Sequence, residues 1–143
     1  MAMLPFCGYN MADYFGHWLK VGSSTKSENL PKIFFVNWFR RDEDGRFLWP
    51  GYGENSRVLK WIFDRVDGKS NAVKTSIGYL PAPADIDTNG MSIDAADLDT
   101  LLSLDTDGWK AAVPQIREHY AQFGDKLPSK LAASLAELES ALA

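Results

Sequence analysis

Lys32-Ile33-Phe34-Phe35-Val36-Asn37-Trp38-Phe39 is the stretch that decides the predicted fold class. It is short and rich in β-branched and aromatic residues, which is typical of a strand buried on both faces. Two shorter candidate strands lie at residues 47–49 and 77–80. Three strands are too few to form a sheet in which one strand is buried on both faces. We therefore expect the sheet to be completed by something outside this chain.

Helices are predicted on both sides of these strands. Apolar residues recur at helical spacing over residues 11–19, 58–66, 98–102, 109–123 and 131–142. Asn10 is a candidate cap for the first helix, and Pro114 predicts a kink or a restart in the fourth. We therefore predict an α+β fold: a few central strands flanked by helices, with a helical C-terminal part.

Length and composition limit the class of protein. With 143 residues, 45% hydrophobic and 24% charged, the chain has the size and composition of one folded domain. Its longest apolar stretches are far shorter than the roughly 18 residues that a bilayer span needs. A single cysteine, Cys7, permits neither an internal disulfide nor a four-cysteine zinc site. We expect a cytoplasmic protein with no membrane partner.

Charge divides the chain into two parts. Residues 1–80 carry eleven Lys and Arg against eight Asp and Glu, whereas residues 81–143 carry four against eleven. The basic part is the better place for a phosphate-bearing ligand. Its excess of three positive charges is too small to predict a nucleic-acid partner.

Aromatic residues concentrate between residues 38 and 57, together with closely spaced glycines and Asn55. A purine base needs flat apolar surfaces and a few hydrogen bonds at its edge. An Asn amide offers a donor and an acceptor, which match a carbonyl and a neighbouring ring N–H, as guanine has. The alternative is that the aromatic residues pack a core and that Asn55 or Ser56 caps the following helix.

One block in this region is long and specific: Phe47-Leu48-Trp49-Pro50-Gly51-Tyr52-Gly53-Glu54-Asn55-Ser56-Arg57. With Phe6-Cys7-Gly8-Tyr9-Asn10 and Val36-Asn37-Trp38-Phe39-Arg40, it resembles the GTP-dependent phosphoenolpyruvate carboxykinases, particularly those of the actinobacterial type. The resemblance is strong to about residue 81 and looser beyond it. It aligns the chain with the C-terminal part of a much longer enzyme.

The resemblance implies a guanine-binding site. In the family, aromatic side chains clamp the guanine, an Asn contacts its edge, and a Gly-Glu pair completes the loop through its backbone. The aromatic residues of the clamp match Phe39, Phe47 and Tyr52. The Asn matches Asn55, and the Gly-Glu pair matches Gly53 and Glu54. Tyr52 stands where animal members carry Phe, and Trp38 and Trp49 flank the loop without contacting the base.

The resemblance also implies an activity. The family converts oxaloacetate and GTP to phosphoenolpyruvate, GDP and CO2 in gluconeogenesis, by decarboxylation and phosphoryl transfer. Its Mn²⁺ and Mg²⁺ ligands, oxaloacetate-binding arginines and mobile lid correspond to positions before Met1. This chain has no Gly-x-x-x-x-Gly-Lys-Ser/Thr motif. We therefore assign it neither catalytic nor metal-binding residues.

The expected organisation is a single C-terminal segment of the larger nucleotide-binding domain of the carboxykinase fold. Residues 1–80 form its guanine-binding part and residues 81–143 its acidic helical part. The expected partners are a guanine nucleotide and the missing N-terminal part of the enzyme. Alone, the chain is expected to bind guanine weakly or not at all, to have no turnover, and to self-associate if the sheet edge is exposed.

Two other functional classes remain open: a non-catalytic guanine-nucleotide-binding module and a purely structural helical module. Residues 85–90 match the start of a calcium-binding loop, but Ala96 occupies the position that needs a carboxylate. A solvated acidic loop is the preferred interpretation. Four arginines of the basic part are expected to be solvated without a specific role: Arg40, Arg41, Arg46 and Arg57.

Overall fold

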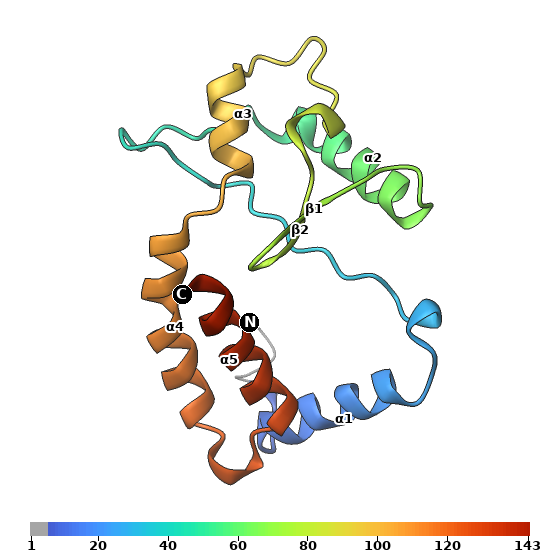
Figure 1. Ribbon diagram of the computed structural model, residues 1–143, viewed down its shortest axis with the longest axis vertical. Coiled ribbons are helices and arrows are strands. Elements are labelled where there is room, and N and C mark those ends of the chain that lie inside the picture. Colours follow the sequence, from blue (N-terminus) through green and yellow to red (C-terminus); the bar gives the residue numbers. More distant parts are fainter. Residues whose placement is uncertain (1–5) are drawn as a thin grey trace. The chain divides into compact units, whose positions relative to one another are not determined.

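The computed structural model describes residues 6–143, whose elements are shown in Figure 1. The chain divides into two compact units. One consists of Met1–Pro31 and Asp105–Ala143, and the other of Lys32–Leu104. Within the described residues, no helix is both long and apolar enough to cross a bilayer.

The first unit is helical. It contains α1 (Met11–Ser23), η2 (Ser27–Asn29), α4 (Thr106–Ala121), η5 (Gly124–Lys126) and α5 (Ser129–Leu142). As predicted, Asn10 caps α1, and its Oδ1 accepts a hydrogen bond of 2.9 Å from the Ala12 backbone N–H. Helix α4 is continuous through Pro114, and α5 runs back beside it (Figure 1). Met11, Ala12 and Phe123 form a buried hydrophobic cluster in this unit.

The second unit combines helices with a small sheet. Its elements are η3 (Tyr52–Glu54), α2 (Asn55–Val66), β1 (Val73–Thr75), β2 (Gly78–Leu80), η4 (Pro83–Asp85) and α3 (Ala95–Leu102). Strands β1 and β2 form an antiparallel hairpin in which Val73 lies opposite Leu80. The predicted strand at 77–80 is confirmed, and the mixed content agrees with an α+β fold.

The predicted strand at residues 32–39 is wrong for this chain. In the described residues the segment pairs with no other strand, although its side chains alternate between exposed and half-buried. Phe34 packs edge-on against Trp61 with ring centroids 6.1 Å apart, whereas Ile33 and Phe35 are 92% and 95% exposed. A strand needs a neighbouring backbone to take its hydrogen bonds, and the second unit offers this segment none.

The predicted strand at residues 47–49 is also wrong. Only an isolated antiparallel bridge forms there, between Arg41 and Phe47. The few central strands of the prediction are therefore reduced, among the described residues, to the β1–β2 hairpin.

Candidate functional site

A tight turn brings together the two ends of the segment from residue 39 to residue 48. Gly45 adopts a φ of 82°, and its N–H donates to the Asp42 carbonyl at 3.1 Å. The N–H of Leu48 donates to the Arg40 carbonyl at 3.0 Å, which closes the loop. Glycine is favoured at a positive φ because it has no Cβ. Asp44-Gly45 is a pair typical of such turns, and the turn positions the side chains on either side of it.

Phe39 and Phe47 meet at the base of this turn. Their ring centroids lie 6.2 Å apart at an interplanar angle of 64°. The Arg41 guanidinium lies 4.0 Å from the centroid of Phe47, where it makes a cation–π contact and covers one ring face. Both rings nevertheless face solvent, with Phe39 70% and Phe47 45% exposed. The structure therefore unites two of the three predicted clamp residues on the surface.

The third predicted clamp residue, Tyr52, stands apart. Gly51 has a φ of 129°, a conformation that other residues rarely adopt, and it turns the chain into η3. Tyr52 follows it and is 91% exposed. Within the part of the chain that the structure describes, no ring contact joins Tyr52 to Phe39 or Phe47. Gly53 is exposed beside it.

Asn55 is held by an indole. The Nε1–H of Trp49 donates to Oδ1 of Asn55 at 2.8 Å. Trp49 is only 8% exposed and packs on Trp38, with ring centroids 5.8 Å apart. Helix α2 begins at Asn55 itself, and no side chain makes a capping bond at its start. The alternative interpretation of Asn55 as a helix cap is therefore wrong.

Arg46 ties the turn to α3. Its guanidinium donates to both carboxylate oxygens of Asp97, at 2.9 and 2.8 Å. It also lies 2.9 Å from the Asp42 carboxylate. The hydrogen bond from Arg46 holds the pKa of Asp97 below its ordinary value. Two parallel bonds between an arginine and a carboxylate also fix the relative orientation of the two side chains, and this positions the turn relative to α3.

Arg57 and Arg40 make comparable ties. The Arg57 guanidinium donates to Glu54 at 2.5 Å and to the carbonyls of Asp87 and Asn89 at 2.8 Å. Arg40 donates to the carbonyls of Leu101 and Ser103 at 3.2 and 2.9 Å. The expectation that these arginines are merely solvated is wrong, because each anchors the aromatic region to residues far away in sequence.

The described residues do not fit a metal site. They contain no cluster of three or more His, Cys, Asp or Glu side chains that could hold an ion. In the acidic loop, Asp85 accepts from the Ala82 N–H at 3.0 Å, and Asp87 accepts from the Asn89 N–H at 3.1 Å. Because Arg57 also occupies two carbonyls of this loop, a calcium role for the loop is not supported.

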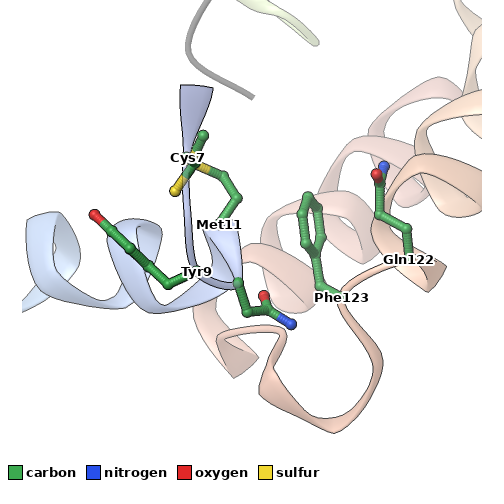
Figure 2. A pocket seen from close by; sticks show the side chains of 6 residues that line it. Cys7, Tyr9, Met11, Gln122 and Phe123 are labelled. Atoms are coloured by element: carbon green, nitrogen blue, oxygen red, sulfur yellow. The ribbon is translucent and has the colours of Figure 1, made fainter. Parts of the chain in front are cut away.

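Two small hollows lie away from the aromatic region. Figure 2 shows the first, of about 180 Å³, in the helical unit. It is lined by Cys7, Tyr9, Asn10, Met11, Gln122 and Phe123. The second, of about 210 Å³, lies between the hairpin and α3. Both are smaller than the roughly 300 Å³ at which small-molecule sites begin. The candidate site is the exposed aromatic surface of the second unit, where Phe39 and Phe47 meet.

Comparison with known proteins gives a consistent result. Residues 1–141 match the family described as the phosphoenolpyruvate carboxykinase C-terminal P-loop domain. Relatives named phosphoenolpyruvate carboxykinase [GTP] include one from Treponema pallidum, 57% identical over 97% of this chain. A relative from Neocallimastix frontalis is 54% identical over 99% of this chain, and one from an Arthrobacter species is 46% identical over 100% of it. The chain spans only 23% of the length of each of these relatives.

Proposed function

The chain belongs to the GTP-dependent phosphoenolpyruvate carboxykinase family, and on that premise we propose that it supplies the guanine-recognition part of such an enzyme. The complete protein would convert oxaloacetate and GTP to phosphoenolpyruvate, GDP and CO2. A role in gluconeogenesis and a cytoplasmic location follow from the same resemblance. In this proposal the chain is one segment of the larger nucleotide-binding domain, with its guanine-binding part in residues 1–80 and its acidic helical part in residues 81–143.

The exposed pair of Phe39 and Phe47 carries the proposal. Aromatic rings of a structural core are buried, whereas these are 70% and 45% exposed. Their exposure leaves them accessible to a ligand. Since Arg41 covers one face of Phe47, a base would stack on the opposite face. Tyr52, 91% exposed, is available for the other side of the clamp.

Hydrogen bonding at the base edge falls to Asn55, with Gly53 and Glu54 completing the loop through their backbone. Arg57 supports this assignment, because its 2.5 Å bond to Glu54 ties the loop to the start of α2. No phosphate clamp is assigned to this chain. The triphosphate, the metal ions and oxaloacetate would be held by the remainder of the longer enzyme.

Residues 32–39 supply a natural contact with that remainder. The segment is extended, and the apolar side chains of Ile33 and Phe35 are more than nine-tenths exposed. An exposed apolar extended segment is a template for pairing with another strand. We therefore propose that the rest of the nucleotide-binding domain covers it. Without that domain, self-association of the chain is the expected consequence.

The test uses two proteins. One is the 143-residue chain, and the other is a chimera in which this chain replaces the matching segment of the Treponema pallidum carboxykinase. Titration calorimetry compares GDP with ADP. We expect the chimera to bind GDP at least about tenfold more tightly than ADP, as differences of a few hydrogen bonds allow. The isolated chain should bind either nucleotide weakly or not at all and should form no phosphoenolpyruvate.

Other outcomes separate the alternatives. An active chimera with equal affinity for GDP and ADP would refute the guanine-recognition role. Phosphoenolpyruvate formation by the isolated chain would refute the claim that the rest of the enzyme holds the triphosphate, the metal ions and oxaloacetate. Tight, guanine-selective binding by the isolated chain without turnover would instead favour a non-catalytic binding module.

A further inference from the structure

The side-chain amide of Asn55 has a fixed orientation. An indole nitrogen can only donate a hydrogen bond, so the atom of Asn55 that lies 2.8 Å from Trp49 Nε1 must be its oxygen. Rotating the amide by half a turn would place its NH2 group against the indole N–H, donor against donor. The NH2 group is therefore the end of Asn55 left for a ligand. In the described part of the chain it has no intramolecular acceptor.

Trp49 is well placed to impose this orientation. It is 8% exposed, lies next to buried Leu48 and packs on the ring of Trp38. A buried ring with packed neighbours keeps one rotamer, so its N–H remains at a constant place. Asn55, at the start of α2, is also fixed by the helix backbone. The hydrogen bond thus joins two groups that are each already restrained.

The fixed amide discriminates between purines. Guanine carries an oxygen at position 6, which accepts a hydrogen bond from an amide NH2 group. Adenine carries an amino group there, which is itself a donor. A freely rotating Asn suits adenine well, because it can present its oxygen to that amino group. Turning the oxygen toward the indole instead directs the NH2 group at the base edge, where it meets the position-6 oxygen of guanine or the amino group of adenine.

We propose that Trp49 is a positioning residue that sets the guanine preference of the site by fixing the amide of Asn55. This inference rests on the guanine-binding function proposed above and adds a residue to it. Trp49 need not touch the nucleotide. Its effect is transmitted through one hydrogen bond.

The main test is Trp49→Phe, which retains an aromatic ring but removes the donor. In the chimeric enzyme, we expect the ratio of GDP to ADP affinity to fall about tenfold, the discrimination lost with one directed base contact. Inosine diphosphate keeps the position-6 oxygen, so the substitution should change its affinity as it changes that of GDP. The matched control is Trp18→Phe, which makes the same change at an exposed tryptophan of α1 outside the proposed site, and it should keep the wild-type ratio.

A spectroscopic measurement covers the case in which Trp49→Phe does not fold. In the wild-type chimera with ¹⁵N-labelled tryptophan, the Trp49 indole N–H should stay protected from solvent exchange after GDP is added. Loss of that protection on GDP binding would show that Asn55 leaves the indole, which would overturn the proposal. An unchanged GDP to ADP ratio in folded Trp49→Phe would overturn it as well. Absence of any guanine preference in the wild-type chimera would instead refute the proposed function itself.

Discussion

Phe39→Ala is expected to weaken GDP binding by the chimeric enzyme by roughly tenfold to a hundredfold. Stacking of a base on an aromatic side chain contributes about 1–3 kcal/mol, and this substitution removes one stacking surface. Phe39 is 70% exposed and contacts Phe47 only edge-on, so its loss should cost the folded state little. Titration calorimetry with GDP measures the effect directly.

Phe63→Ala is the matched control for this substitution. Phe63 is 69% exposed, as Phe39 is, but it lies on α2 outside the proposed site. We expect the control to bind GDP like the wild type. Equal GDP affinity in Phe39→Ala and the wild type would mean that Phe39 does not contact the base.

Trp61→Ala is expected to destabilise the chain by roughly 3–5 kcal/mol, the usual cost of removing a large buried aromatic side chain. Trp61 is 5% exposed and packs against Phe34, which makes it a central contact of the second unit. Its Nε1 is buried and, in the described structure, has no hydrogen-bond partner. Trp61→Phe should cost less, because it keeps a ring in place and removes that unpaired donor.

Urea unfolding of the 143-residue chain, followed by circular dichroism, measures these differences. Phe63→Ala again serves as the control, because a surface substitution on the same helix should change the free energy of unfolding by no more than about 0.5 kcal/mol. A midpoint for Trp61→Ala equal to that of the wild type would show that the second unit is not organised around this residue.

The helices were predictable because their signal is local. The apolar spacing from Met11 onward and the cap at Asn10 are both confirmed in α1, and the same spacing predicts α2 through α5. The strand at residues 32–39 was not predictable in this way. Its apolar side chains indicate that both faces favour an apolar environment. A strand also needs a neighbouring backbone for its hydrogen bonds, and the composition does not show whether one is present. In the structure only the Phe34 side of the segment finds a neighbour.

The contact between Phe39 and Phe47 could be predicted from the sequence, whereas the hydrogen bonds that hold this region could not. The turn at Gly45 explains how Phe39 and Phe47 meet. The pair Asp44-Gly45 is typical of such a turn and is visible in the sequence. The bond from Trp49 to Asn55 follows no helical or strand period, so no pattern reveals it. The pair of Arg46 and Asp97 spans 51 positions, a separation at which only the folded chain shows that two charges meet.

The most direct test of the guanine-recognition role is to locate the base on the chain. The chimeric enzyme is irradiated with 8-azidoguanosine diphosphate, digested with trypsin and analysed by mass spectrometry. Cleavage at the basic residues releases peptides 33–40 and 47–57, which hold Phe39 and the rest of the proposed guanine contacts. We predict labelling of these two peptides, blocked by excess GDP but not by ADP. Labelling confined to other peptides of the enzyme would contradict the proposed role of this chain.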